Sequence, residues 1–473
     1  MTILTNLFRV LLLLCCPLVL AAQTSEPAPT YIYIDDIKIE GNRKTKNARI
    51  LRELDLAPGD SVLMSALGAA LSRNRLFLMN TGLFSEAKIN VRNWQEGNCV
   101  ELLLVLDEAW YLFPFPVFSL ADRNFNVWWH EFDRDLRRVN YGIDFYHFNL
   151  TGQGDQAKAA VQLGYAQRAE FIYDRPGINK KQTMGIRASF LRSRQRETFY
   201  KTADDKLLFL FTPDEFISTR TVGSAALTWR PGLFTWHTLT LERHENQVAD
   251  SVTRELNPDF FLHGDTRQKH WSLIYKFLRD RRDIRPYPLR GWLGLAELRV
   301  NGLVPSDNLR VGRLLVEGNK YFSFSEKLSL ETILVGRTSF PRRKIPYFNN
   351  QALGYGGNYV RGYEYYVADG LDFALLKTGL HFQIFDRAVN LGKWMPLKAY
   401  KIFPIKVYFA VNNDFGYAND PHYAANNSLS NRLLSGHGIG LDFVGYYTRV
   451  VQIEWSRNDR GESGFYVNIK MGF

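Results

Sequence analysis

Apolar and polar residues alternate in short segments along most of the chain, from Trp110 to Phe473. Turn-forming residues separate these segments, and none of them shows helical periodicity over a useful length. A period of two places successive side chains on opposite faces of a strand. An even number of strands is typical of single-chain bacterial barrels. The pattern predicts sixteen strands, near residues 111–120, 140–149, 156–165, 169–173, 183–192, 215–230, 235–246, 269–280, 292–301, 308–318, 327–337, 372–385, 404–414, 433–446, 447–458 and 464–473.

The last predicted strand has the clearest pattern, because one of its faces is strictly apolar. This face carries Phe465, Val467, Ile469, Met471 and Phe473. The opposite face carries Gly464, Tyr466, Asn468, Lys470 and Gly472. A strand of this kind has one side against lipid or a protein core.

Residues 31–108 follow a different pattern, that of a small α+β domain. Tyr31–Glu40 reads as a strand, and Thr45 is a plausible N-cap for a helix that ends at Leu54. Apolar residues then recur at helical spacing from Leu63 towards Leu78. Two strands follow, near 84–91 and 100–106. The predicted order is β-α-α-β-β.

Residues 1–22 read as a secretory signal peptide. Arg9 supplies the positive charge, and residues 10–20 form an apolar run that is too short to span a bilayer. Leu14 before Cys15 disfavours a lipoprotein signal. A polar spacer, 23–30, comes next, and no later stretch is apolar over 18 residues. The pattern predicts an exported chain that can cross a membrane only with strands.

Composition fits a transmembrane barrel but also a large soluble β-protein. Hydrophobic residues make up 46% and aromatic residues 14%, while the mean hydropathy is only −0.23. In a transmembrane barrel, apolar lipid-facing and polar lumen-facing side chains alternate, so the mean hydropathy of the chain stays moderate. The formal charge is +11, yet lysine and arginine are scattered without a basic run of five or more residues. We therefore expect lumen, rim and lipid-headgroup charges rather than a nucleic-acid partner.

No motif for catalysis or for a cofactor is present. Cys99 is the single cysteine after the leader, so no disulfide framework forms, and metal-ligand spacing is absent. Gly-x-Ser-x-Gly, His-Glu-x-x-His and phosphate-binding loops are also missing. Catalytic residues on separate strands would leave no such signature. His130, His147, His237 and His381 are nevertheless interpreted as rim or lumen residues, so no enzyme activity, metal or cofactor is expected.

A long, turn-rich segment, residues 338–370, follows the eleventh predicted strand and carries Gly356-Gly357-Asn358-Tyr359-Val360-Arg361-Gly362-Tyr363. With the small domain in the periplasm, strand counting makes this segment an extracellular loop and puts the chain end on the periplasmic side. An arginine inside a barrel is costly unless a carboxylate meets it. Counting leaves residues 386–403 as an unexplained, long periplasmic turn.

The chain resembles the BamA/TamA-like outer-membrane superfamily, also called the surface-antigen family. Residues 31–108 resemble a polypeptide-transport-associated (POTRA) domain. The matching positions there are Ile37-x-Ile39-x-Gly41-Asn42-x-x-Thr45, Ile50-x-Arg52-Glu53-Leu54, Gly59-Asp60 and Thr81-Gly82-Leu83-Phe84. Residues 109–473 match as a barrel through Asp280-x-Arg282-Asp283 with Pro288 and Gly291, Val360–Tyr363, Asp414-x-Gly416 and the terminal Phe473.

This resemblance implies that residues 338–370 fold back into the barrel, where Arg361 contacts acidic residues of the wall. Val360, Arg361, Gly362 and Tyr363 would then form a lock with Asp414 and Gly416. The apolar face of residues 405–411 supports this, because it turns Asp414 towards the lumen. Asn412 departs from the family pattern, which prefers an aromatic residue there.

The resemblance also implies a function in outer-membrane protein insertion or polypeptide translocation. A weak seam between the first and last barrel strands would expose backbone groups to an incoming strand. Pro114, Pro116, Gly464, Gly472 and Phe473 are the candidate seam residues. The implied partners are unfolded outer-membrane or secreted polypeptides, outer-membrane lipids, and accessory periplasmic proteins or lipoproteins. Only one POTRA-like unit is found, so a passive outer-membrane channel stays the alternative.

Overall fold

The computed structural model of the chain describes residues 30–120, 136, 139–395, 401–445 and 449–471. The predicted signal peptide (1–22), nearly all of the spacer (23–30), His130, Gly472 and Phe473 lie outside the described residues.

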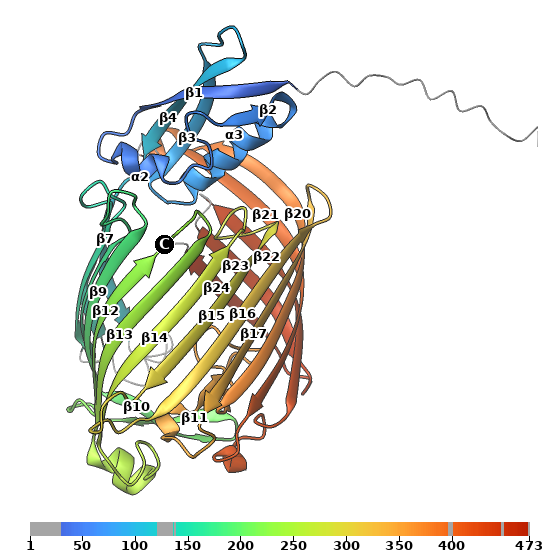
Figure 1. Cartoon of the computed structure of the whole chain (residues 1–473). Coiled ribbons are helices and arrows are strands. Elements are labelled where there is room, and N and C mark those ends of the chain that lie inside the picture. The colour runs from blue at the N-terminus through green and yellow to red at the C-terminus, as the bar shows by residue number, and fades with distance from the viewer. Residues whose placement is uncertain (1–29, 121–135, 137–138, 396–400, 446–448, 472–473) are drawn as a thin grey trace, which may run out of the picture.

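The barrel predicted from alternation is present as one 16-stranded antiparallel sheet (Figure 1). Each strand pairs with its neighbour in the barrel order. The strands are β5 (Leu112–Leu120), β6 (Val139–Phe148), β7 (Gln156–Gly164), β8 (Ala166–Arg175), β9 (Met184–Gln195), β12 (Ser218–Trp229), β13 (Thr235–Val248), β14 (Arg267–Asp280), β15 (Gly291–Asn301), β16 (Val311–Ser323), β17 (Leu328–Phe340), β20 (Asp372–Asn390), β21 (Ile402–Asn419), β22 (Leu433–Gly445), β23 (Arg449–Asn458) and β24 (Ser463–Met471).

Strand β21 shows how the sequence sorts its side chains between lumen and lipid. From residue 408 to residue 418, even-numbered positions are buried and odd-numbered positions are exposed. Tyr408, Asn412 and Asp414 therefore point inward, whereas Phe409 and Val411 form part of the outer surface. A pleated strand with polar residues inside and apolar residues outside is typical of a barrel whose outer face lies in lipid.

The N-terminal domain has the predicted α+β fold with one additional short strand. Its elements are β1 (Tyr31–Glu40), α2 (Asn47–Leu51), β2 (Ser61–Leu63), α3 (Met64–Met79), β3 (Phe84–Arg92) and β4 (Cys99–Glu108). The sheet order is β2-β1-β4-β3, with β1 and β4 parallel. Ile34, Leu78, Leu102 and Leu104 are fully buried between the sheet and the helices.

The prediction that Thr45 caps the first helix is wrong. Helix α2 begins at Asn47, its N-cap is Lys46, and no side chain caps it. The backbone N–H and the hydroxyl of Thr45 both donate to Oε1 of Glu108, each over 2.6 Å. Asn149 from the barrel also donates to the Thr45 hydroxyl, at 2.8 Å. The hydrogen bonds of Thr45 therefore help to join the small domain to the barrel instead of capping a helix. The local sequence does not reveal this contact.

The small domain lies against one mouth of the barrel (Figure 1). We call this end the periplasmic end and the opposite end the extracellular end, after the orientation that strand counting predicts. Lys46 N–H donates to the carbonyl of Gly152 over 2.9 Å, and Nη2 of Arg52 donates to the carbonyls of Arg230 and Gly232. The rings of Phe77 and Phe234 meet edge to face, with centroids 5.3 Å apart. These contacts dock the domain on the rim at several separate points.

Glu53 is the electrostatic centre of this docking. Nη1 and Nη2 of Arg230 donate to its two carboxylate oxygens over 2.5 and 2.8 Å, and Arg49 pairs with the same carboxylate. Burial alone raises the pKa of Glu53, but the two guanidinium groups outweigh it and lower the pKa to about 2. Glu53 is therefore ionised in the docked domain, and its charge holds Arg230 of the barrel rim.

Glu53→Gln is expected to weaken docking by about 3 kcal/mol, because it leaves Arg230 buried without its carboxylate. Glu53 has a folded pKa near 2, below the ordinary 4.5, so its contribution is complete above about pH 4.5 and is lost as the pH falls towards 2. Hydrogen exchange of residues 31–108 measures docking. The difference between wild type and variant should shrink over that pH range.

The control for this prediction is Glu86→Gln, which removes an exposed ion pair with Lys88. Exposed pairs contribute at most about 1 kcal/mol, so this variant should exchange like wild type. Equal exchange in wild type and Glu53→Gln at pH 7 would contradict the docking role of Glu53.

Two departures from the predicted barrel concern its ends. A hairpin, β10 (Glu197–Ala203) and β11 (Lys206–Phe211), extends from between β9 and β12 at the extracellular end. A single π-helical turn follows β13, over Ser251–Leu256. At the periplasmic end, β20 and β21 continue as a paired ribbon to Asn390↔Ile402. The ribbon therefore accounts for both ends of the segment that strand counting left as a long turn, residues 386–390 and 402–403.

The remaining elements are short. They are two strands, β18 (Gln351–Leu353) and β19 (Ala368–Asp369), and three 3-10 turns, Tyr347–Asn349, Gly392–Trp394 and Ala424–Asn426. Among the helices of the described ranges, none has the length and apolar character needed to cross a membrane.

Candidate functional site: the inward-folded motif loop

The segment between β17 and β20, which we call the motif loop (residues 341–371), packs into the barrel instead of extending from it. Its apolar side chains are buried against the wall strands. The cluster comprises Val335, Ala352, Leu353, Val360, Tyr363, Ala368, Phe373, Leu375, Ala418, Leu429 and Leu434. Loop and wall thus share one small hydrophobic core inside the barrel.

Arg361 lies between two carboxylates of the lumen wall. Its guanidinium donates to Asp414 on β21, and its Nε donates to Oε2 of Glu454 on β23 over 2.8 Å. The backbone N–H of Arg361 also donates to Asp414, at 3.2 Å. Asp414 is 0% exposed and Glu454 is 7% exposed. Charge-assisted hydrogen bonds to two fixed, buried carboxylates are strong and directional.

Glu454 was missed by the sequence interpretation, although a signal was present. Val451, Ile453 and Trp455 alternate along β23 as an apolar face, so Glu454 lies on the opposite face, towards the lumen. The amide of Asn412 donates to Glu454 over 2.6 Å. Asn412, where the family pattern has an aromatic residue, therefore positions the second carboxylate that receives Arg361.

Three glycines let the loop lie directly on the wall. Gly362 has φ of +78°, and a Cβ there would lie 2.7 Å from the backbone nitrogen of Asn458. A Cβ on Gly416 would lie 2.4 Å from Cγ2 of Val360. A Cβ on Gly436 would lie 1.8 Å from the carbonyl oxygen of Arg361. Gly416 was a predicted site residue, whereas Gly436 was not.

Gly436→Ala is expected to push the motif loop off the wall, because the added carbon meets backbone rather than a flexible side chain. A cost of about 1–3 kcal/mol is typical of such overpacking. Proteolysis within residues 341–371 should become faster. Gly318→Ala is the matched control, since a Cβ there meets nothing within 4 Å. Equal protection of the loop in both variants would argue against this close contact.

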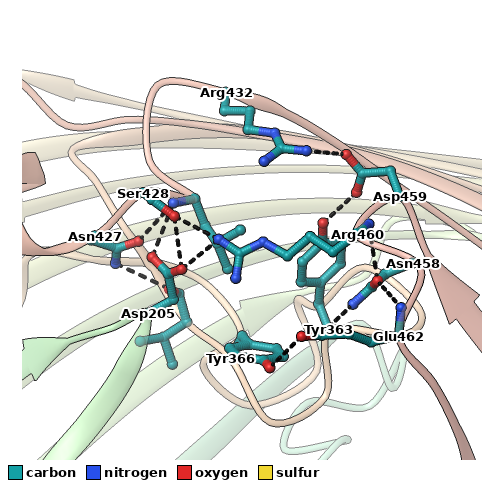
Figure 2. A network of polar contacts seen from close by, with 12 residues as sticks. Asp205, Tyr363, Tyr366, Asn427, Ser428, Arg432, Asn458, Asp459, Arg460 and Glu462 are labelled. Atoms are coloured by element: carbon teal, nitrogen blue, oxygen red, sulfur yellow. Dashed lines mark hydrogen bonds and ion pairs between the residues drawn. The ribbon is translucent and has the colours of Figure 1, made fainter.

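The motif loop also holds the turn that connects β23 to β24 (Figure 2). The hydroxyl of Tyr363 donates to Asp459, and Nδ2 of Asn458 donates to the carbonyl of Gly362 over 2.8 Å. The hydroxyl of Tyr366 donates to Glu462 at 3.0 Å. The conformation of the loop is therefore linked to the hairpin that ends in the last strand.

The tip of the β10–β11 hairpin joins the same network from the other side of the mouth (Figure 2). Asp205 accepts hydrogen bonds from Arg460 at 2.6 Å and from Ser428 at 2.8 Å. Val367 N–H donates to its carbonyl over 2.9 Å. Burial raises the pKa of Asp205, but these donors outweigh burial and lower it below the ordinary value. The hairpin thus crosses the extracellular mouth as a strap.

The periplasmic turn after β14, which the sequence singled out, touches both the small domain and the lumen wall. Asp280 accepts two hydrogen bonds from Arg282, at 2.8 and 2.9 Å. Asn80 of the small domain donates to the carbonyl of Asp283 at 2.8 Å. Tyr287 enters the lumen and donates to Asp442 on β22, also over 2.8 Å. This turn therefore links the position of the domain to the wall.

The candidate seam residues lie on the two end strands of the sheet. Pro114 and Pro116 on β5 stand opposite Phe145 and Ile143 of β6, and Gly464 on β24 stands opposite Ser456. The sheet order runs from β24 to β5, and no pairing joins these two strands within the described ranges. Gly472 and Phe473 fall in the part of the chain that the structure leaves undescribed.

A cavity of about 740 Å³ lies in the lumen between the small domain and strands β7 to β15. Charged side chains line it, among them Arg187, Lys276, Arg299, Asp174, Glu242 and Glu297. Side chains of both signs of charge therefore face the cavity. Within the described residues, no group of three histidine, cysteine or acidic side chains is arranged to hold a metal ion.

Comparison with known families and structures accords with this architecture. Residues 149–372 match the Omp85 superfamily domain, and residues 32–109 match the POTRA family described as a surface antigen variable number repeat. No curated protein sequence matches the chain significantly.

Two kinds of solved structure share the fold. BamA from Haemophilus ducreyi lacking POTRA domains 1–3 aligns with a TM-score of 0.51 at 13% identity, over 93% of this chain and 84% of that one. CdiB from Escherichia coli aligns with a TM-score of 0.56 at 11% identity, over 93% of this chain and 76% of that one. Identities this low support a shared fold and leave activity to be argued from the site.

Proposed function

We propose that this chain, whose residues 149–372 match the Omp85 superfamily domain, inserts polypeptides into the outer membrane, or passes them across it, by pairing strands at a seam between β5 and β24. Its clients are unfolded outer-membrane or secreted polypeptides, with outer-membrane lipids around the seam and accessory periplasmic proteins or lipoproteins as further partners. The sites described above involve backbone pairing and ion pairs, so the proposed work needs no covalent chemistry.

The observation that carries this proposal is that, within the residues the structure describes, no ladder joins the two end strands. Every other neighbouring pair of barrel strands is joined by backbone hydrogen bonds. An unpaired strand edge is a template for another strand, and adding a strand satisfies its free N–H and C=O groups. A client segment that binds β5 or β24 would enter the bilayer already hydrogen-bonded.

Pro114 and Pro116 support the seam because they are spaced by two and so face the same neighbour. Proline has no N–H to donate and is tolerated in a strand where that donor would point away from the paired strand. Since β5 is paired with β6, the missing donors belong to the side of β24. The seam therefore lacks two hydrogen bonds that would otherwise close it.

The motif loop supports the same mechanism because it braces the barrel wall next to the seam. Arg361 fixes the loop to β21 and β23, and Tyr363 fixes the loop to the β23–β24 turn. We assign Arg361, Asp414 and Glu454 the role of the lock, with Val360, Gly362, Tyr363 and Gly416 providing the close fit. A braced wall next to a weak seam lets β24 move without unfolding the barrel.

The test is client folding in liposomes that contain the mature chain. An unfolded outer-membrane barrel is added, and its folding is followed by heat-modifiable gel mobility. We expect faster folding than in protein-free liposomes. Pro114→Val with Pro116→Val should slow it roughly fivefold or more, because two restored ladder bonds contribute about 1–3 kcal/mol to closure. Pro305→Val, in an exposed extracellular turn, is the control.

An absence of acceleration would overturn the proposal. If the liposomes instead leaked ions while client folding stayed at the protein-free rate, the passive channel would be the better account. The charged lumen cavity is the feature that such a channel would use.

A further inference from the structure

The periplasmic ribbon, residues 384–390 of β20 with residues 402–404 of β21, extends past both neighbouring strands. Strand β17 pairs with β20 only as far as Leu328↔Phe382. Strand β22 pairs with β21 only from Ile405↔Gly445 onward. Gln383 N–H still donates to Lys327, at 2.8 Å. Beyond it, no described strand pairs with the outer edge of β20, so this stretch presents an open edge at the periplasmic end.

An open edge this long carries unpaired backbone groups, since alternate residues of an antiparallel strand turn their N–H and C=O away from the partner. Proteins usually cover or interrupt such edges. The ribbon instead keeps large apolar side chains exposed: Ile384 is 53% exposed and Ile402 is 63% exposed. Phe385 and Val389 are also exposed. An exposed edge with apolar side chains is suited to receive another strand.

The side chains on the two faces of the ribbon favour a polypeptide over membrane lipid as the molecule that binds its open edge. Phe385 and Val389 share the face that continues the lipid-facing side of β21, as their partners Val407 and Phe403 show. Ile402 lies on the opposite face, with Asn390. Lipid would cover only one of these faces and could not pair with the backbone. A strand added to the edge of β20 would extend both faces and complete the ladder.

The charges of the ribbon indicate the chemistry of that strand. Arg387, Lys393 and Lys401 are exposed, and none has an ion pair within the described residues. Asp386, in contrast, pairs with Lys406 over 3.1 Å. The unpaired charges are therefore all positive. Acidic side chains on an incoming strand would meet these cations without competition from the ribbon itself.

We infer that the outer edge of β20, residues 384–390, binds an extended client segment in which apolar and acidic residues alternate. This docking edge lies at the periplasmic end, with three strands between β20 and β24, so a client would bind it before reaching the seam. The inference rests on the proposed function, since it names where the clients of that function first pair.

Photo-crosslinking of the full mature chain in phospholipid nanodiscs tests this inference. Benzoylphenylalanine is placed at Val389 in the ribbon or, as a control, at Leu380, which lies on the lipid face of the same strand. The probes are two synthetic peptides, one alternating valine with aspartate and one alternating valine with lysine. We expect the aspartate peptide to crosslink at 389 and not at 380, roughly tenfold more than the lysine peptide if three charge pairs form.

Arg387→Glu with Lys393→Glu and Lys401→Glu should reverse the preference between the two peptides. Equal crosslinking of both peptides at 389, or capture of lipid there instead of peptide, would overturn the inference. Heat-modifiable mobility of each variant shows whether its barrel is folded, so a failure to crosslink is interpretable.

A shortened chain separates this inference from the proposed function. Replacing residues 387–405 by Asn-Gly joins Asp386 to Lys406, which already stand opposite each other, through a two-residue turn. We expect the shortened chain to speed client folding several-fold less than the full chain. Equal acceleration by both would reject the docking edge and keep the proposed function. If neither chain accelerated client folding, the proposed function would be rejected. The crosslinking result would then show by itself whether the edge of β20 binds the peptide.

Discussion

Arg361→Met is expected to release the motif loop from the lumen wall and to abolish the acceleration of client folding. The substitution keeps the apolar stem but leaves Asp414 and Glu454 buried without their cation. Removing one partner from a buried ion pair typically costs about 3–5 kcal/mol. Lys377 lies 3.7 Å from Asp414 and can offset only part of this charge. Hydrogen exchange over residues 341–371 should rise by more than a hundredfold.

A rescue variant separates charge from shape at this site. Asp414→Asn with Glu454→Gln in the Arg361→Met background removes the two uncompensated carboxylates, so protection of the loop should partly return. Arg342→Met is the matched control, because Arg342 lies in the same loop but its pair with Asp372 is exposed. If Arg361→Met and Arg342→Met gave the same exchange, the lock would have to be abandoned.

The barrel strands were predictable because one physical constraint, lipid outside and polar lumen inside, acts at every strand. The alternation on residues 405–414 was enough to turn Asp414 inward. The same rule applied to Val451, Ile453 and Trp455 would have identified Glu454. The contact between Arg361 and these residues was not predictable from pattern alone, because it depends on how the loop folds back. It was an implication of the family resemblance.

The β11 strand and the ribbon were missed in the sequence analysis, because neither keeps the alternation of apolar and polar residues with a period of two. The β11 strand, Lys206–Phe211, is nearly continuous in apolar residues, and its turn uses Asp204 and Asp205, both at positive φ, instead of the usual asparagine-glycine. The ribbon was missed because a bulge between Gln383 and Phe385 shifts the register of β20. Side chains after the bulge no longer match the alternation before it.

The hairpin strap gives an expected result that separates insertion from secretion. Asp205→Cys with Ser428→Cys places two cysteines at the contact that closes the extracellular mouth, where Ser428 Oγ donates to Oδ2 of Asp205 over 2.8 Å, and oxidation is expected to join them. Insertion through the β5–β24 seam leaves this mouth shut, so client folding should be equal in oxidised and reduced protein. Secretion through the lumen needs the mouth open, so oxidation should block release of a secreted client almost completely.

Asp205→Asn tests the strap without a crosslink. It weakens a charge-assisted contact to Arg460, and such contacts contribute about 1.5–3 kcal/mol, so the open mouth should be populated roughly ten- to a hundredfold more. Single-channel recording would show this as a higher open probability. Asp204→Asn, on the same turn but exposed, is the control. A rise in both variants would assign the effect to the turn and not to the strap contact.

Insertion through the seam is thus compatible with a closed strap, whereas secretion through the lumen requires the strap to open. The motif loop connects them, because Tyr363 and Tyr366 bind the β23–β24 turn while Val367 binds the hairpin tip. Releasing Arg361 should therefore free the loop from both the β23–β24 turn, which it braces, and the hairpin tip, whereas releasing Asp205 should loosen only the mouth. If Arg361→Met stops client folding while Asp205→Asn leaves it unchanged, the client leaves sideways through the seam. If both change client transport, its path runs through the lumen.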